Sequence, residues 1–226
     1  MKKPLILILS ILSVILAVIF AAAALRLENM SFLSAAAAAL LCIPFFLGYE
    51  KNGKNSRITV IVAVMSALAV VGRFIFAEAP GFKPVTAIVV ITGIYLGPQA
   101  GFMTGSLAAL ISNVYFGQGP WTPFEMLAWG FTGFVAGIIN KRGFLEKKIP
   151  LLIYGALAGV MYSLIMDIYT VLIMTGGFSL IKYITAVISS AWFTGIYAIS
   201  NVTFLLLIMV PADRIMKRIK KKYGIQ

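Results

Sequence analysis

The sequence predicts an all-α integral membrane protein of about eight helices, and three observations lead to that prediction. Hydrophobic residues make up 61% of the 226 residues and charged residues only 12%, a balance with too little polar surface for a soluble domain. Apolar runs of about 20 residues, the length that crosses a bilayer as a helix, recur along the chain. The basic residues gather in the short connections between these runs. We therefore expect one membrane domain with no soluble domain attached.

Proline positions support the predicted helix boundaries. Pro84, Pro98 and Pro123 each stand where an apolar run begins, and proline is favoured at the first helical position. The run 84–97 is short for a full span, since at about 1.5 Å per residue it covers only about 20 Å. We expect it to be tilted, buried or joined to a turn inside the membrane. The apolar segments are 4–25, 32–49, 57–77, 84–97, 98–116, 122–139, 150–175 and 180–210.

The first segment has two interpretations. Lys2 and Lys3 followed by an apolar run and four alanines at 21–24 resemble a cleaved signal peptide. The apolar run is about 20 residues long, however, which exceeds the usual core of a signal peptide. We expect a retained helix.

The distribution of positive charge predicts the orientation. With the N-terminus placed in the cytoplasm, 15 of the 19 Lys and Arg residues fall on the inner side. Only Arg26, Lys83 and Lys182 fall on the outer side, and Arg73 lies within a helix. The excess of positive residues in cytoplasmic loops predicts a multi-pass protein of the bacterial cell membrane with both termini inside. The 15 are Lys2, Lys3, Lys51, Lys54, Arg57, Lys141, Arg142, Lys147, Lys148, Arg214, Lys217, Arg218, Lys220, Lys221 and Lys222.

Small residues recur at helical spacing. Such rows let helix backbones approach closely in lipid, so we expect the glycines to pack helices against each other. Ala63 and Ala67 form a similar face on the 57–77 helix, where packing within the chain and docking onto another membrane subunit fit the spacing equally well. The glycines of these rows are Gly93, Gly97, Gly101, Gly105, Gly130, Gly133, Gly137, Gly155 and Gly159.

Polar side chains inside the apolar segments predict a pocket near the outer surface. Charged and amide groups within a bilayer are costly and usually serve function, and three of them, Arg73, Asn113 and Asp167, fall at the outer ends of their segments. Asn201 falls deeper. The outer loops 78–83, 117–121 and 176–182 combine glycine, an aromatic ring and polar groups, which suits a mobile cover over a ligand. The predicted pocket residues are Arg73, Phe82, Lys83, Asn113, Gln118, Trp121, Trp129 and Asp167.

Four polar or aromatic residues of this region also have a structural interpretation. Arg73 would extend to the interface or pair with Asp167. Glu125 lies three residues after Thr122, the spacing of a capping box, and this favours a helix cap over a ligand contact. Trp121 and Trp129 fit an interfacial aromatic belt as well as ligand stacking.

Several chemistries lack their residues in this sequence. The chain has no histidine, which removes the commonest general base and the commonest metal ligand. It has neither a phosphate-binding loop nor the His-Glu-x-x-His motif, and Asp167 is alone in its apolar segment, without the second aspartate of an aspartyl protease. The sequence thus predicts neither an enzyme nor a metal or cofactor site, and no nucleic acid partner.

Residues 57–139 resemble the substrate-specific (S) subunits of energy-coupling factor (ECF) transporters. The resemblance rests on Gly72-Arg73, on 80–84 (Pro-Gly-Phe-Lys-Pro), on 97–101 (Gly-Pro-Gln-Ala-Gly) and on Ser112-Asn113 followed by 117–123 (Gly-Gln-Gly-Pro-Trp-Thr-Pro). It extends over about 57–210, which would be a six-helix substrate-binding core. Residues 1–50 would then be two additional N-terminal helices, and 211–226 a basic cytoplasmic tail.

The resemblance implies a function. Such subunits capture a vitamin or related micronutrient from outside and deliver it with a shared transmembrane coupling subunit and two ATPases. Their first core helix carries an Ala-x-x-x-Ala face for the coupling subunit, which Ala63 and Ala67 match. Cobalamin is the first expectation for the vitamin. The alternatives are a stand-alone ion-coupled secondary transporter and a membrane protein with no ligand.

Overall fold

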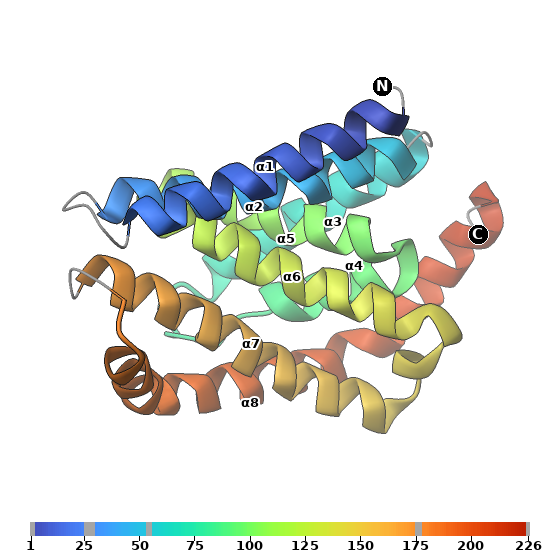
Figure 1. The fold of residues 1–226 in the computed structure, drawn as a ribbon. Helices are drawn as coiled ribbons and strands as arrows, with labels where there is room; N and C mark the ends of the chain where they lie inside the picture. The colour runs from blue at the N-terminus through green and yellow to red at the C-terminus, as the bar shows by residue number, and fades with distance from the viewer. Residues whose placement is uncertain (1–2, 25–29, 53–55, 175–177, 225–226) are drawn as a thin grey trace.

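The computed structural model describes residues 3–24, 30–52, 56–174 and 178–224, which form eight α-helices and two short 3-10 turns, without a strand in these ranges (Figure 1). By length and composition, α3, α6 with the following turn, α7 and α8 could each cross a membrane. The elements are α1 (Lys3–Ala24), α2 (Met30–Asn52), α3 (Ser56–Ile75), α4 (Val85–Leu96), α5 (Pro98–Phe116), α6 (Thr122–Ile139), η1 (Asn140–Arg142), η2 (Phe144–Glu146), α7 (Lys148–Met174) and α8 (Leu180–Tyr223).

The all-α membrane architecture expected from the sequence is confirmed, with small differences at the helix ends. The largest concerns α8, which continues through Pro211 to Tyr223. The basic segment that follows residue 210 is thus helical to Tyr223 and continues the last membrane helix.

The short helix α4 lies at the centre of the core. All of its residues from Val85 to Tyr95 are buried, and it packs against α3, α5, α6, α7 and α8. Gly97, with a φ of 94°, turns the chain directly into α5, a backbone conformation that other residues rarely adopt. The expectation of a short, buried segment joined to a turn is therefore confirmed.

Close backbone contacts hold α4, α5 and α6 together. A Cβ added to Gly93 would lie 2.1 Å from the carbonyl oxygen of Gly133, and one added to Gly133 would lie 2.6 Å from the carbonyl oxygen of Gly101. Any side chain at these positions would force the backbones apart. The glycine rows thus serve internal packing, as expected.

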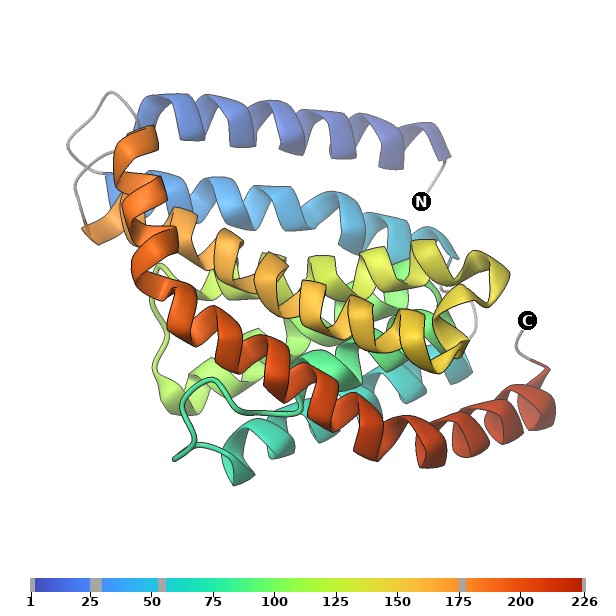
Figure 2. The ribbon, with the colours of Figure 1, turned by 90° about the horizontal axis from the view of Figure 1, so that it is seen from below.

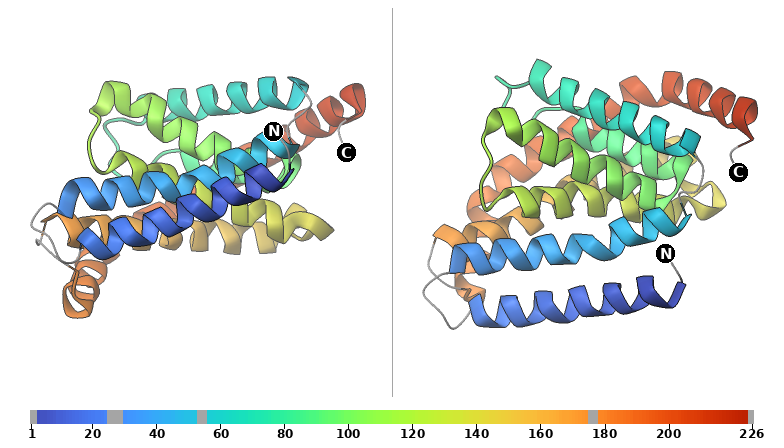
Figure 3. Two further views of the ribbon diagram at one scale, coloured as in Figure 1. Left: turned by 45° about the horizontal axis from the view of Figure 1, so that its top comes forward. Right: turned by 90° about the horizontal axis from the view of Figure 1, so that it is seen from above.

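The helices form layers across the molecule. The hairpin of α1 and α2 lies at one edge, with α2 packed on α5 and α6, and α3 lies at the opposite edge (Figure 3). In α2, the Phe45 ring stacks on Phe102 of α5 at 4.0 Å between centroids. The α7–α8 hairpin packs along another side of the core (Figure 2).

The connections fall at two ends of the bundle. The segments 76–84 and 117–121, the end of α7 and the start of α8 lie at one end, and the start of α1, η1, η2 and the end of α8 at the other (Figure 1). The described basic residues assigned to the inner side belong to the second end. Lys2, Arg26, Lys54 and the glycine pair 176–177 of the third predicted loop lie outside the described residues.

Candidate substrate-binding site

Arg73, in the last turn of α3, directs its guanidinium into the protein. One of its nitrogens, Nη1, donates to Ser112 Oγ at 2.6 Å and to Asn113 Oδ1 at 2.8 Å, both on α5. Its Nη2 lies 3.2 Å from Glu125 Oε1 on α6. The guanidinium also lies over the rings of Phe116 and Trp129, at 4.8 and 4.9 Å from the centroids, a favourable cation–π arrangement. Arg73 thus joins three helices.

Glu125 is the centre of this buried network. Besides Arg73, its carboxylate accepts hydrogen bonds from Asn113 Nδ2 at 2.8 Å and from the Tyr162 hydroxyl of α7 at 3.2 Å. Three side chains, from α3, α5 and α7, therefore hold the carboxylate of this α6 residue in place. A buried charge with this many partners keeps a fixed position.

The capping-box prediction for Glu125 is wrong. Trp121 takes the cap position in a helical conformation, without a side-chain hydrogen bond to the helix. The Thr122 hydroxyl lies inside the first turn, where it donates to Gln118 Oε1 at 2.9 Å and accepts from Asn113 Nδ2 at 3.0 Å. Glu125 faces the core because Arg73 offers it a stronger partner than a backbone N–H does.

The two structural interpretations of Arg73 are also wrong. Its side chain is buried and does not extend to the interface. Its carboxylate partner is Glu125 rather than Asp167, whereas Asp167 Oδ2 accepts a hydrogen bond from Ser190 Oγ of α8 at 2.8 Å.

A cavity of about 430 Å³ lies beside Glu125, between α6, α7, α8 and the segment before α4. Five aromatic side chains form much of its wall, and Lys83, Glu125, Asp167 and Ser190 place polar groups at its surface. It lies at the end of the bundle where α7 ends and α8 begins (Figure 1). The lining residues are Lys83, Trp121, Glu125, Tyr162, Ser163, Met166, Asp167, Tyr169, Thr170, Ser190, Phe193 and Tyr197.

Lys83 provides the cationic group of the cavity. Its backbone N–H donates to Ser200 Oγ at 2.9 Å, and Ser200 Oγ also contacts the Lys83 carbonyl oxygen at 3.2 Å, so α8 fixes this segment. Burial lowers the pKa of the Lys83 ammonium, and the charge of Arg73 lowers it further, while Glu125 opposes the change. A partly desolvated ammonium is a strong donor for a carbonyl or ring nitrogen of a ligand.

The predicted pocket residues divide into four groups. Lys83, Trp121 and Asp167 line the cavity, and Trp129 lines a small hollow next to it. Arg73 and Asn113 lie behind Glu125, which they hold.

The remaining two predicted residues lie away from the cavity. Phe82 packs with Phe76 and Phe204 in an aromatic cluster, and the exposed Gln118 binds the Leu110 carbonyl oxygen.

Sequence reasoning missed the contributions of α7 and α8 to this cavity. Tyr162, Tyr169, Phe193 and Tyr197 all line it, yet each is an ordinary residue within an apolar helix. Their spacing was the available signal: 162, 166 and 169 on α7 and 190, 193 and 197 on α8 each share one helical face. In the described part of the chain, no group of three or more His, Cys, Asp or Glu residues could hold a metal.

A membrane bundle with a polar and aromatic cavity at one end is typical of a solute-binding membrane protein. Comparison with known proteins identifies the family. Residues 54–218 match the family model described as ECF-type riboflavin transporter, S component. The chain belongs to this family and is a transporter subunit rather than an enzyme.

The chain is also similar to a curated protein over part of its length. A UPF0397 protein of Vibrio atlanticus is 24% identical over 105 residues, which are 43% of this chain and 57% of the relative. The chain thus spans little more than half the length of that relative. No solved structure matches.

Proposed function

We propose that this S component captures a flat aromatic vitamin of the riboflavin class in the cavity between α6, α7 and α8. The observation that supports this most directly is the wall of aromatic rings, Trp121, Tyr162, Tyr169, Phe193 and Tyr197, around a space of about 430 Å³. Aromatic walls stack on a planar ring system and contribute roughly 0.5–1.5 kcal/mol for each ring pair. The family description points to the same vitamin.

The size of the cavity favours a single fused-ring vitamin. About 430 Å³ lies within the roughly 300–1,000 Å³ of small-molecule sites, near the lower end. A corrinoid is several times larger than a three-ring heterocycle and would require the helices to separate. Cobalamin, the first expectation from the sequence, stays a prediction that a binding experiment decides.

The polar groups of the cavity suit a neutral heterocycle with hydrogen-bonding edges. Lys83 would donate to a carbonyl or ring nitrogen, and Asp167 would accept from an N–H or hydroxyl group. Glu125 has its carboxylate already bound by Arg73, Asn113 and Tyr162, so it forms a fixed wall. These groups would orient the ligand while the rings supply contact area.

Delivery into the cell would need partners. We propose that a transmembrane coupling subunit docks on α3, where Ala63 and Ala67 are exposed, and that two ATPases supply the energy. The excess of basic residues at the other end of the bundle supports an outer position for the cavity and a cytoplasmic position for both termini.

Ligand binding tests the proposal directly. Purified protein should quench riboflavin fluorescence on binding, because the bound ring stacks on aromatic side chains. Asp167→Asn should weaken binding at least tenfold, about 1.4 kcal/mol, since the neutral amide is a poorer acceptor. Gln118→Ala, outside the cavity, should bind like the unchanged protein. Tight binding of cobalamin without binding of riboflavin would overturn the assignment of the vitamin.

A stand-alone ion-coupled transporter is the second candidate, and the buried carboxylate of Asp167 in the cavity is the observation that favours it. Proteoliposomes that contain this chain alone separate the two functions. Uptake driven by an ion gradient, lost in Asp167→Asn, would support the secondary transporter. Uptake only with the coupling subunit and ATPases would support the S component.

A further inference from the structure

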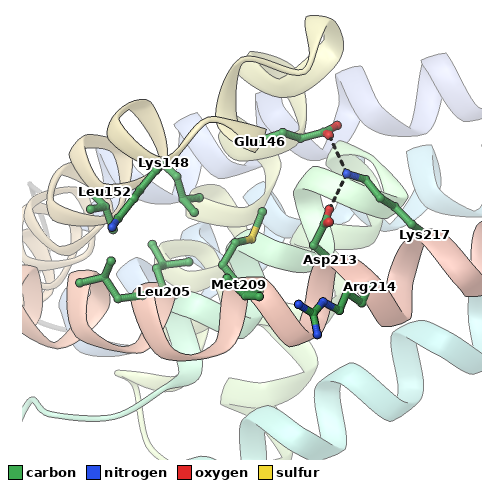
Figure 4. A pocket seen from close by; sticks show the side chains of 11 residues that line it. Glu146, Lys148, Leu152, Leu205, Met209, Asp213, Arg214 and Lys217 are labelled. Carbon is green, nitrogen blue, oxygen red and sulfur yellow. Dashed lines mark ion pairs between the residues drawn. The ribbon is translucent and has the colours of Figure 1, made fainter.

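A second cavity lies at the opposite end of the α7–α8 hairpin. It measures about 360 Å³ and is lined by the first residues of α7 and the C-terminal half of α8 (Figure 4). The proposed vitamin cavity is lined instead by the C-terminal half of α7 and residues 190–197 of α8. The lining residues are Glu146, Lys148, Leu151, Leu152, Leu205, Leu206, Met209, Val210, Asp213, Arg214 and Lys217.

The two cavities are separated by a close approach of the helices. A Cβ added to Gly159 would lie 2.7 Å from the backbone nitrogen of Ala198, and one added to Gly155 would lie 2.5 Å from the Leu205 side chain. The hairpin is therefore tight at its middle and opens toward both ends. The second cavity is therefore a separate site, and none of its lining residues lines the proposed vitamin cavity.

The second cavity has an apolar floor that opens onto the surface expected to face lipid. Leu151, Leu152 and Leu205 form part of the floor. At its edge, Leu206 is 44% exposed and Val210 58% exposed. A hydrocarbon chain fits such a groove, because it covers apolar side chains that the helices themselves leave open.

Basic side chains stand around this floor. Lys217 is held by Asp213 at 2.8 Å and by Glu146 at 3.4 Å. Lys148 and Arg214 lie on different sides of the floor (Figure 4), and neither forms an ion pair with another residue in the described part of the chain. With three cations and two carboxylates, the rim carries a net positive charge. The same end of the bundle also carries Lys141, Arg142, Lys147, Arg218 and Lys220–Lys222.

We propose that this cavity binds an anionic phospholipid of the inner leaflet, such as phosphatidylglycerol. One acyl chain lies on the floor formed by the leucines, and the anionic headgroup lies at the rim, where Lys148, Arg214 and Lys217 supply the positive charge. Basic pockets between membrane helices on the cytoplasmic side are suited to anionic headgroups, and each cation near the surface contributes about 1 kcal/mol. The occupant is a lipid because the apolar floor continues into the lipid-facing surface.

Lipid titration of the delipidated full-length protein tests this proposal. Phosphatidylglycerol should raise the thermal stability in detergent and remain bound in native mass spectra, whereas phosphatidylcholine and glycerol 3-phosphate should do neither. Lys148→Gln with Arg214→Gln should weaken phosphatidylglycerol binding at least tenfold. The matched control, Lys141→Gln with Arg142→Gln, removes two charges at the same end but outside the cavity and should leave binding unchanged.

Three outcomes would overturn the proposal. An equal loss of phosphatidylglycerol binding in both double variants would show general attraction to a basic surface. Equal stabilisation by phosphatidylcholine would show that the cavity does not recognise the charge of the headgroup. Normal lipid binding by Lys148→Gln/Arg214→Gln combined with failed assembly would identify the cavity as a docking site for the coupling subunit. Vitamin binding by the same variants, measured in parallel, keeps the two cavities distinguishable.

Discussion

At the scale of single residues, the Arg73–Glu125 pair holds one wall of the cavity between α6, α7 and α8. Both side chains are buried, and Asn113 and Tyr162 complete the hydrogen bonds of the carboxylate. Burial of two charges costs free energy that their mutual attraction only partly offsets. Removal of one partner is strongly destabilising, because it leaves the other charge buried without a countercharge. Its role here is to fix Glu125 against the cavity, while Arg73 also holds Trp129 beside the small hollow next to it.

Breaking this pair from one side should destabilise the protein. Glu125→Gln leaves the Arg73 guanidinium buried without a countercharge, and we expect a loss of about 3 kcal/mol in the free energy of unfolding. Arg73→Gln should cost a similar amount, and the double variant less than the sum of the two. Thermal unfolding in detergent, followed by tryptophan fluorescence, measures each value.

An exposed ion pair provides the control. Lys217→Gln breaks contacts with Asp213 and Glu146 at a surface where the lysine is 56% exposed, so it should cost no more than about 1 kcal/mol. Additive losses in the Arg73 and Glu125 variants would show that the two residues act independently.

At the scale of helices, glycines set the spacing of α4, α5 and α6. Because Gly133 lies between Gly93 and Gly101 with backbone atoms facing each position, no side chain fits without moving a whole helix. This contact also explains how α4, too short to span a membrane, is held with nearly every residue buried. The helix α6, whose first turn carries Glu125, is one of the three helices held by this contact.

Gly133→Ala should therefore lower stability by at least about 2 kcal/mol, since the added methyl group would lie 2.6 Å from a backbone oxygen. Gly195→Ala on α8 is the matched control, because nothing lies within 4 Å of an added Cβ there. Alanine is a better helix former than glycine by about 1 kcal/mol, so that variant should be neutral or more stable. Equal thermal stability of both variants would contradict the proposed role of the close backbone contact.

At the scale of the whole molecule, the extra hairpin of α1 and α2 leaves the α3 surface uncovered. The hairpin lies at the edge opposite to α3 (Figure 3), and Ala63 and Ala67 remain exposed. A coupling subunit that docks on α3 would thus meet no obstruction from the added helices. The position of the α1–α2 hairpin is thus compatible with the proposed docking on α3.

A bulky residue on α3 should prevent that docking without affecting the vitamin site. Ala63→Trp should bind the vitamin normally and fail to co-purify with the coupling subunit and ATPases, because close helix packing needs small residues. Ile15→Trp, at an exposed position of α1, should assemble normally. Assembly of Ala63→Trp at the level of the unchanged protein would place the docking surface elsewhere.

The sequence by itself determined the membrane class, the helix segments and the positions of Lys83, Trp121 and Asp167 near one end. These follow from local properties: apolar length, charge in connections, and the depth of a polar residue along its own helix. Only the tertiary structure decided that Arg73 pairs with Glu125, that Thr122 and Glu125 form no capping box, and that α7 and α8 supply the aromatic wall. Those outcomes depend on which faces of separate helices meet. The periodicity of residues within one helix does not determine which faces meet, whereas the packing between helices does.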